Sequence, residues 1–331
     1  MAEIQLAGVS KAFGDTQALS DVTMTVPDGA FVVLLGPTGA GKTTTLRLIA
    51  GLDRPDRGDI RIAGRSVLSD TPAQRNVAMV FQQYSLYPHM TVRENLAFPL
   101  RSPILRTPEP QIARKIAEVA EVLRISHKLD NKATALSGGE MQRVSIGRAL
   151  VRDPAAHLMD EPLSSLDAKL RAELRVELKR IQASLGATLL YVTHDQVEAM
   201  TMATHVGVLD HGRMVQFGTP RQIYEDPVSL YVAGRLGLPR INALPADLWA
   251  GAPAGAAVIG LRPEHIAHDH GPQAQVIRVE RLGDQTRLHL ALAGHALVTL
   301  ADPHTALEPG DAVPVAPRNP LYFDAAGARI A

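Results

Sequence analysis

The segment from Gly36 to Thr43 reads Gly-Pro-Thr-Gly-Ala-Gly-Lys-Thr, which matches the spacing of a phosphate-binding loop. Its glycines let successive backbone N–H groups converge on phosphate oxygens at the start of a helix. Lys42 adds a positive charge near the outer phosphates, and the Thr43 hydroxyl is suited to ligating Mg²⁺. The segment therefore predicts a site for a nucleoside triphosphate and its metal ion.

The residues on either side of this loop have the pattern that such a loop requires. Ala30 to Leu35 is a continuous apolar run, typical of a strand buried on both faces, and Thr44 to Ala50 reads as a helix. A glycine-rich turn before an ordinary helix is the simpler interpretation, and this strand–loop–helix context disfavours it. The predicted cofactor-binding residues in this segment are Gly36, Pro37, Thr38, Gly39, Ala40, Gly41, Lys42, Thr43 and Thr44.

Two adjacent carboxylates follow a second apolar run, Leu158-Met159. At the end of a strand, Asp160 can reach a Mg²⁺ ion and Glu161 can polarise an attacking water molecule. Because His157 interrupts the apolar run, the segment taken alone could equally be a loop with solvated acids. In a chain that also has a phosphate-binding loop, we favour a metal-ligating Asp160 and a catalytic Glu161.

A third segment with polar chemistry is Leu136-Ser137-Gly138-Gly139-Glu140. Ser137 and Glu140 have the spacing of a reciprocal capping box, which is the simplest interpretation. Two glycines at the start of a helix nevertheless expose N–H donors that suit a phosphate better than they suit helix stability. The segment is therefore a second candidate phosphate-binding element.

The elements that must position these residues indicate an α/β fold. Short strands at Ile4 to Leu6 and Val22 to Val26 suggest an antiparallel start. The pattern turns helical from about Tyr84 to Leu150, which predicts a helical subdomain. Ala168 to Leu185 reads as a charged helix that Gly186 ends.

The 331 residues are too many for one typical domain and sufficient for two. After about Arg235, prolines and glycines become frequent and divide short alternating segments such as Thr286 to Leu290. This pattern of short alternating segments and turn residues predicts a small C-terminal β barrel or sandwich. We therefore expect one domain over residues 1–235 and a second over 236–331.

The composition excludes several classes of function. Lys plus Arg and Asp plus Glu both number 34, so the net charge is zero and no basic surface for nucleic acid is indicated. There are no cysteines, which excludes disulfides, thiol nucleophiles and thiolate metal sites. No secretory signal is visible, and no apolar run approaches the roughly 20 residues that span a bilayer. A role at a membrane would therefore depend on a partner subunit.

Ser137 to Glu140 resembles the signature motif of ABC ATPases, and further segments resemble motifs of that family in the family's order. Gln82 is similar to the Q-loop glutamine, Leu166-Asp167 to the D-loop, and His194 to the switch histidine. Phe13 stands where the family places an aromatic ring against adenine. A lone glutamine or histidine would be an ordinary surface or structural residue, so the ordered set is what makes the resemblance specific.

This resemblance implies a P-loop NTPase core with antiparallel β and helical subdomains. ATP would lie between the phosphate loop of one protomer and the signature motif of a second. Glu161, Gln82 and His194 would be catalytic, and the metal ligands would be Thr43, Gln82 and Asp160. With ATP and Mg²⁺ as cofactors, the further cofactor-binding residues would be Phe13, Gln82, Ser137, Gly138, Gly139, Glu140, Asp167 and His194.

Leu261 to His265 and Leu321 to Asp324 resemble the C-terminal β regulatory domain, an OB-like barrel, of bacterial carbohydrate-importer ATPases such as those for maltose and glycerol phosphate. Tyr84 to Met90 resembles the segment that receives a permease helix in that family, although these residues could instead pack internally. The implied partners are a second ATPase copy, two permeases docking near Gln82 and Tyr84 to Met90, and a periplasmic or extracellular solute-binding protein. The implied location is peripheral, on the cytoplasmic face of the inner membrane.

The sequence leaves other functions open. An importer ATPase for iron, a polyamine or an oxyanion would share the same core and a similar β domain. A soluble ABC ATPase acting on nucleic acid or the ribosome would use the C-terminal barrel as an oligonucleotide-binding module. The neutral charge and the sparse aromatic residues of that barrel disfavour a nucleic-acid partner. A small-molecule kinase would leave Ser137 to Glu140 and His194 unexplained.

Overall fold

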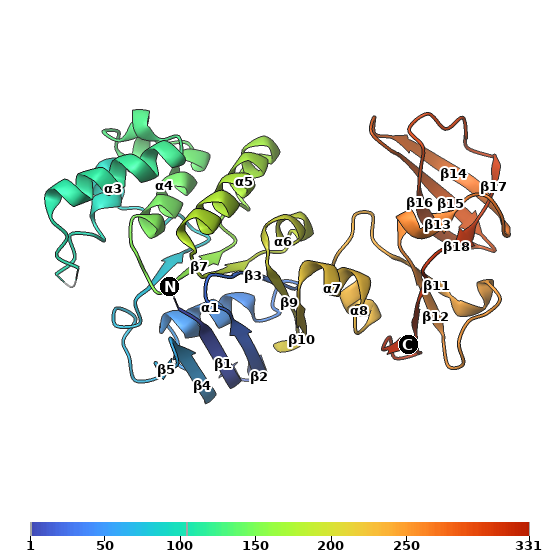
Figure 1. The fold of residues 1–331 in the computed structure, drawn as a ribbon, viewed down its shortest axis with the longest axis horizontal. Helices are drawn as coiled ribbons and strands as arrows, with labels where there is room; N and C mark the ends of the chain where they lie inside the picture. Colours follow the sequence, from blue (N-terminus) through green and yellow to red (C-terminus); the bar gives the residue numbers. More distant parts are fainter. Residues whose placement is uncertain (1, 104, 331) are drawn as a thin grey trace. The chain divides into compact units, whose positions relative to one another are not determined.

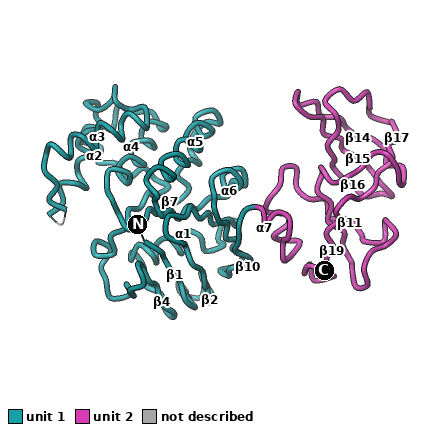
Figure 2. Tube along the Cα trace, viewed as in Figure 1, with its two compact units in different colours: residues 1–220 teal, residues 221–331 magenta. Residues whose placement is uncertain are grey.

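The computed structural model describes residues 2–103 and 105–330. The chain forms two compact units, residues 1–220 and 221–331 (Figure 2). No helix within the described ranges is both long enough and apolar enough to cross a membrane. The first unit contains all the residues that were predicted to bind nucleotide.

An antiparallel sheet begins the first unit, as the sequence predicted, and its strands run longer than the apolar segments alone indicated. Their order is β2-β1-β4-β5, and neighbours are antiparallel. The inward side chains Ile4, Leu6 and Val9 are fully or almost fully buried, which fixes the register of β1. The strands are β1 (Ile4–Phe13), β2 (Thr16–Val26), β4 (Arg57–Ile62) and β5 (Arg65–Ser66).

A second, mixed sheet has the order β10-β9-β3-β8-β7-β6, in which all neighbours except β9 and β10 are parallel (Figure 1). Every residue of β3 is buried, as its continuous apolar sequence predicted. The parallel strands β3, β7 and β8 end at the same edge, because Leu34 pairs with Val192 and Asp160 also pairs with Val192. The strands are β3 (Phe31–Leu35), β6 (Val77–Val80), β7 (Ala156–Asp160), β8 (Leu189–Val192), β9 (His205–Asp210) and β10 (Arg213–Gly218).

Helix α1 (Lys42–Ala50) follows the glycine loop and shares one apolar core with both sheets. Leu46, Leu48 and Ile49 are completely buried in that core. The helix ends at Gly51, whose φ of 77° is the left-handed conformation that glycine adopts without strain. The strand–loop–helix order predicted around the phosphate loop is thus present.

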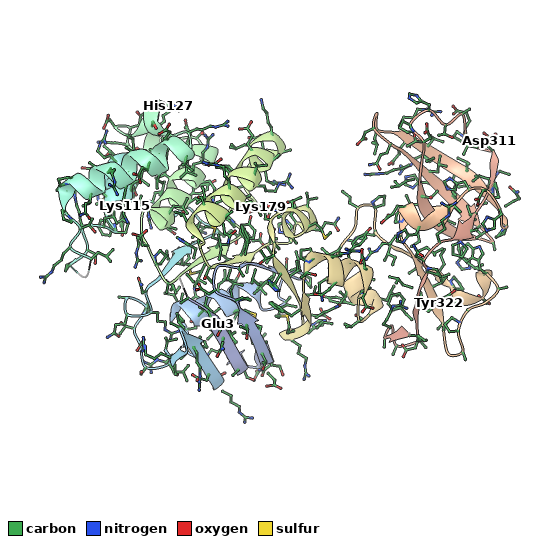
Figure 3. All side chains as sticks on the ribbon, viewed as in Figure 1. Glu3, Lys115, His127, Lys179, Asp311 and Tyr322 are labelled. Atoms are coloured by element: carbon green, nitrogen blue, oxygen red, sulfur yellow. The ribbon has the colours of Figure 1, made fainter. Side chains whose placement is uncertain are left out.

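The helical region after β6 ends at Leu150 as predicted but begins at Val92 rather than near Tyr84, because residues 84–91 form turns and irregular backbone. The buried residues of its longest helix are Ile112, Ile116 and Ala120. Lys115, which is labelled in Figure 3, lies on the same helix and pairs with Asp153. The elements are α2 (Val92–Ala97), α3 (Glu109–Val122), α4 (Gly138–Leu150) and the short 3₁₀ turns η1 (Ser126–Lys128) and η2 (Ala133–Ala135).

Two further helices flank β8. Helix α5 (Ala168–Leu185) is the predicted charged helix, and Gly186 ends it with a φ of 59°. Helix α6 (Gln196–Met202) follows the loop after β8, and it contacts α5 (Figure 1). These two helices therefore connect to the same edge of the mixed sheet as the phosphate loop.

The second unit is rich in antiparallel strands, as predicted. Its sheets have the orders β11-β12-β19-β20, β13-β18 and β16-β15-β14-β17, and Tyr322 on β19 pairs with Ile330 (Figure 3). Its helical turns are α7 (Pro220–Glu225), α8 (Leu230–Ala233), η3 (Ala246–Leu248) and η4 (Pro263–His265). Its strands are β11 (Asn242–Pro245), β12 (Val258–Leu261), β13 (Ile266–Ala267), β14 (Gln273–Arg281), β15 (Thr286–Leu292), β16 (His295–Ala301), β17 (Ala312–Pro314), β18 (Ala316–Pro317), β19 (Leu321–Phe323) and β20 (Arg329–Ile330).

The boundary between the compact units lies earlier than the division after residue 235 that the change in composition suggested. Arg262 explains the difference, because its guanidinium donates to the carbonyls of Ala233 at 3.0 Å and of Tyr224 at 2.8 Å. The same guanidinium also donates to Leu236 and lies 3.8 Å from the Tyr224 ring centroid. Helices α7 and α8 are therefore attached to the β domain.

We expect Arg262→Ala to lower the free energy of unfolding of the second unit by about 3 kcal/mol, because it leaves buried carbonyl groups without donors. Denaturant unfolding followed by fluorescence measures this directly, since Trp249 is the single tryptophan and lies in that unit. The exposed Arg240→Ala is the matched control and should leave the midpoint unchanged. Equal midpoints for the two variants would contradict the attachment.

Candidate nucleotide site

The phosphate loop is closed tightly against its neighbours. A Cβ atom at Gly36 would lie 2.5 Å from the Leu209 carbonyl oxygen, and one at Gly41 would lie 2.6 Å from that of Ala18. Gly41 also has a φ of 100°, which L side chains rarely adopt. Lys42 is 6% exposed, and its Nζ donates to the carbonyls of Gly36 at 2.9 Å and Pro37 at 3.0 Å. The Lys42 ammonium group is thus held against the loop backbone, and its binding of phosphate remains a prediction.

Thr43 and Asp160 come from distant parts of the chain and meet at the end of β7. The Thr43 hydroxyl donates to Asp160 Oδ1 at 3.0 Å. Burial raises the pKa of Asp160, while the Thr43 hydrogen bond and the charges of Lys42 and Arg47 act in the opposite direction. A cation beside this carboxylate would favour its ionised form.

This pair fits the ligand chemistry of Mg²⁺. Hydroxyl and carboxylate oxygens are hard ligands, and Mg²⁺ commonly takes one or two protein groups together with waters and substrate phosphates. Residues 2–103 and 105–330 contain no group of three His, Cys, Asp or Glu side chains that could hold a metal without such help. The donor set therefore suits a metal that arrives with a nucleotide.

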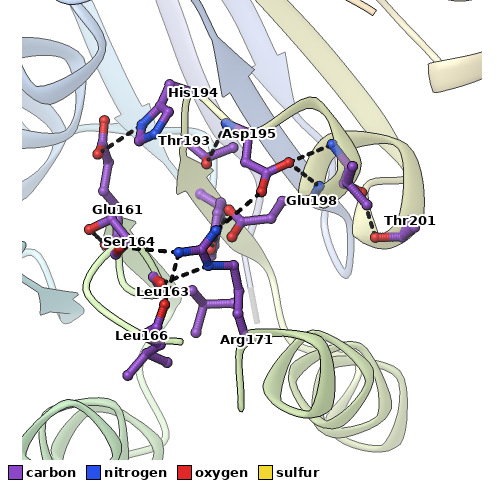
Figure 4. Close-up of polar contacts among 12 residues, drawn as sticks. Glu161, Leu163, Ser164, Leu166, Arg171, Thr193, His194, Asp195, Glu198 and Thr201 are labelled. Atoms are coloured by element: carbon purple, nitrogen blue, oxygen red, sulfur yellow. Dashed lines mark hydrogen bonds and ion pairs between the residues drawn. The ribbon is translucent and has the colours of Figure 1, made fainter. Parts of the chain in front are cut away.

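Glu161 and His194 form the second polar pair at this edge (Figure 4). Glu161 Oε2 lies 3.1 Å from His194 Nδ1, and the Glu161 backbone N–H donates to the Val192 carbonyl at 3.0 Å. Glu161 has a φ of 45°, an uncommon conformation that is concentrated at functional sites. The Glu161 side chain is mostly buried, whereas that of His194 is 64% exposed. The pair thus presents a carboxylate and an imidazole where β7 and β8 end.

The segment from Ser137 to Glu140 forms the capping box at the start of α4. Ser137 Oγ accepts from the Glu140 N–H at 3.4 Å, and Glu140 Oε2 accepts from the Ser137 N–H at 2.8 Å. The Ser137 backbone hydrogen bond is the main cause that lowers the pKa of Glu140 to about 2, and Lys128 contributes from 3.1 Å. Ser137 thus bonds to Glu140 at the start of α4, whereas Thr43 of the phosphate loop bonds to Asp160 at the end of β7.

The remaining predicted site residues occupy separate positions. Gln82 is exposed in the segment after β6. Phe13 is 48% exposed at the end of β1, with Lys11 Nζ 5.2 Å from its ring centroid. Asp167 caps α5, because its Oδ1 accepts from the Leu170 N–H at 2.9 Å. The roles of Gln82, Phe13 and Asp167 in nucleotide binding therefore remain predictions.

A groove of about 580 Å³ lies beside the Tyr84 to Met90 segment. Buried Asn95 shapes this segment, accepting from the Tyr87 N–H at 2.9 Å and donating to the Tyr87 carbonyl at 3.1 Å. The Tyr87 ring packs 4.4 Å from that of Phe98, and Arg148 lies 5.3 Å from the Tyr87 ring centroid. The groove is lined by Ala73, Gln74, Asn76, Ala78, Met79, Tyr87, Phe98, Pro99, Ser102, Leu105, Arg148, Ala149 and Arg152.

Sequence reasoning missed one residue at the polar edge, Arg171 on α5. Its guanidinium donates to backbone carbonyls between Glu161 and α5 (Figure 4). No motif marked this arginine, because one cation in a charged helix usually belongs to a solvated face. Its position on the first turn of the helix that follows Glu161 was the available signal.

A parallel-stranded core with a phosphate loop before α1 and two carboxylates at the end of β7 defines a P-loop ATPase domain. A family model described as ABC transporter matches residues 19–164, and one described as TOBE domain matches residues 259–319. The chain belongs to the ABC transporter ATP-binding proteins and is an ATP hydrolase.

Its similarity to curated relatives extends over almost the whole chain. It is 45% identical to the sn-glycerol-3-phosphate import ATP-binding protein UgpC of Ruegeria sp. (strain TM1040), with 98% of this chain and 97% of the relative covered. It is 47% identical to the protein of the same name from Brucella abortus biovar 1 (strain 9-941), with 88% of each chain covered. The match therefore includes the strand-rich second unit.

Solved structures resemble the first unit. The dimeric bacterial ABC transporter cassette MJ0796 aligns with a TM-score of 0.60 and 29% identity, covering 66% of this chain and 99% of that one. A post-hydrolysis dimer of the same cassette, bound to ADP and phosphate, gives the same values. Nucleotide binding by this fold is thus supported independently of the motifs.

Proposed function

We propose that two copies of this chain hydrolyse ATP at shared sites to energise an importer for glycerol phosphate or a related sugar or polyol. The observation that supports shared sites is that the two phosphate-binding elements bond to different parts of the fold. Lys42 and Thr43 lie with Asp160, whereas Ser137 caps a different helix. A relative with a similar fold is described as a dimer. We infer that Ser137, Gly138 and Gly139 of a second copy complete each site.

In this proposal each residue at the edge of the mixed sheet has a separate role in ATP hydrolysis. Glu161 accepts a proton from the attacking water, and His194 holds the Glu161 carboxylate and contacts the outer phosphate. Lys42 and the loop N–H groups stabilise charge on the phosphate oxygens. Thr43, Asp160 and Gln82 would hold Mg²⁺, which would supply positive charge to offset that of the phosphate oxygens.

We assign the groove beside Tyr87 to a helix of a permease subunit. Apolar side chains make up most of its lining, together with two arginines and the polar side chains of Gln74, Asn76 and Ser102, and Phe98 is 46% exposed there. Large exposed apolar patches mark interaction sites. The proposed complex contains two permeases, an external solute-binding protein and two copies of this chain, held peripherally at the cytoplasmic face of the membrane.

Phe98→Asp tests the groove. We expect this variant to lose stimulation of its ATPase by the permeases about tenfold or more, because it buries a charge in an apolar contact. Its basal ATPase should equal that of the parent, since the Phe98 ring packs on Tyr87 rather than at the phosphate loop or the ends of β7 and β8. Val176→Asp, which alters another exposed apolar residue, is the control. Full stimulation of Phe98→Asp would place the permease elsewhere.

The cargo assignment is based on the names of relatives that are 45–47% identical to this chain. Reconstituting the chain with two permeases and a solute-binding protein provides the test. We expect sn-glycerol-3-phosphate or a related polyol or sugar to stimulate ATP hydrolysis. Stimulation by ferric iron, a polyamine or an oxyanion alone would replace the proposed cargo.

A further inference from the structure

Arg171 fixes the backbone that connects Glu161 to α5. Its Nε donates to the Leu163 carbonyl at 3.3 Å, and its Nη2 donates to the carbonyls of Ser164 at 3.3 Å and Leu166 at 2.9 Å (Figure 4). A guanidinium presents its donors in a rigid plane, so one side chain can hold several carbonyls in a fixed arrangement. Arg171 therefore determines the path of the chain immediately after Glu161.

The same guanidinium faces the loop that contains His194. Arg171 Nη1 lies 3.9 Å from Oδ2 of Asp195, the residue after His194. The other oxygen of Asp195 accepts from the Val197 N–H at 2.7 Å and the Glu198 N–H at 3.4 Å, and so caps α6. Asp195 thus joins Arg171 to the backbone at the start of α6.

His194 also contacts the segment between Glu161 and α5, whose carbonyls accept hydrogen bonds from Arg171. His194 Nδ1 lies 3.1 Å from Glu161 Oε2. The Glu161 carbonyl accepts from the Ser164 N–H at 3.2 Å and from Ser164 Oγ at 2.9 Å. Because the Ser164 carbonyl in turn accepts from Arg171, the contacts form a closed ring through Glu161, Ser164, Arg171, Asp195 and His194.

The charges around this ring indicate which contacts matter most. The side chains of Arg171 and Asp195 are 31% and 25% exposed, so solvent screens their attraction. Buried Glu198 also lies nearby; burial raises its pKa and the charge of Arg171 opposes this shift. The planar hydrogen bonds to the carbonyls should therefore contribute more than the charge alone, and lysine should replace Arg171 poorly.

We propose that Arg171 is a positioning residue for ATP hydrolysis, which sets the geometry of Glu161 relative to His194. The proposal rests on the functions proposed above for those two residues. A displacement of about 1 Å at a reacting group can cost about a hundredfold in rate. Loosening the ring should therefore lower kcat, while binding of ATP at the phosphate loop persists.

The test compares Arg171→Ala, Arg171→Lys and the control Arg180→Ala in the full-length chain. Arg180 lies on the same helix and pairs with Glu177, outside the ring. We expect kcat to fall about tenfold in Arg171→Ala and less in Arg171→Lys, with the Kd for ATP within about twofold of the parent. Arg180→Ala should match the parent in both quantities. An unchanged kcat in Arg171→Ala, or an equal loss in ATP affinity, overturns the proposal.

A double mutant separates positioning from general destabilisation. Asp195→Asn keeps an oxygen to cap α6 but removes the charge that faces Arg171. If both residues act through one ring, the double variant should have a kcat close to that of Arg171→Ala, whereas independent effects would multiply. The imidazole NMR signal of His194 should shift in Arg171→Ala and not in Arg180→Ala. If the losses of kcat multiply and the NMR signal of His194 does not shift, the proposed ring is wrong.

The outcome for Glu161→Gln distinguishes this proposal from the proposed active site. If Glu161→Gln is inactive and Arg171→Ala is fully active, only the positioning role is wrong. If Glu161→Gln hydrolyses ATP at the parental rate, the assignment of Glu161 to the active site is wrong. The positioning role of Arg171 is then wrong as well.

Discussion

Glu161→Gln should lower the kcat of ATP hydrolysis by about a hundredfold or more, because glutamine cannot accept the proton of the attacking water. The substitution is nearly isosteric, so the unusual backbone conformation at this position is kept. ATP should still bind, since Lys42 and the loop amides are untouched. The measurements are steady-state hydrolysis and the Kd for ATP from calorimetry on the same preparation.

The control for this experiment is Glu177→Gln, which removes a partly buried carboxylate of α5 that pairs with Arg180. It should hydrolyse ATP at the parental rate. A Glu161→Gln protein that is as active as this control would exclude Glu161 as the general base. A loss of ATP affinity equal to the loss of kcat would instead indicate that the substitution disturbs the binding site.

The sequence was sufficient to place the phosphate loop, because its glycines are required by the geometry. At Gly36 and Gly41 a Cβ atom would collide with backbone carbonyls of segments far along the chain. Strand β3 was predictable because a continuous apolar run is typical of a buried strand. The end of helix α5 was predictable because Gly186 readily adopts the left-handed conformation that ends a helix.

Other features depend on contacts between distant segments and left no such signal. The ring through Arg171 and Asp195 requires α5 to lie beside the loop after β8, which no local pattern specifies. The extent of the second unit depends on Arg262, which holds the backbone at Tyr224 and Ala233 from a distant turn. Composition changes only after these residues, whereas the compact units divide after residue 220.

Ser137→Arg should abolish the ATP-dependent dimer while leaving ATP binding by the monomer intact. In the proposed site Ser137 faces the nucleotide of a second copy, where a bulky cation would prevent close approach. The variant also loses the cap of α4, which costs about 1 kcal/mol, so Ser137→Ala is needed to measure that effect alone. Light scattering with ATP, in a Glu161→Gln background that prevents hydrolysis, measures the dimer. Ser184→Arg, near the exposed end of α5, should dimerise normally.

Mixing two defective proteins tests whether Ser137 acts on the site of its partner. A Lys42→Ala protein lacks the phosphate-loop cation, and a Ser137→Arg protein lacks the opposing motif. If each site takes its phosphate loop from one protomer and Ser137 from the other, both substitutions of a mixed dimer lie in the same site. The other site of that dimer then has an unaltered Lys42 and an unaltered Ser137. ATP should then dimerise the mixture although neither protein dimerises alone. If Ser137 served the site of its own protomer, both sites of the mixed dimer would be damaged and no dimer would form.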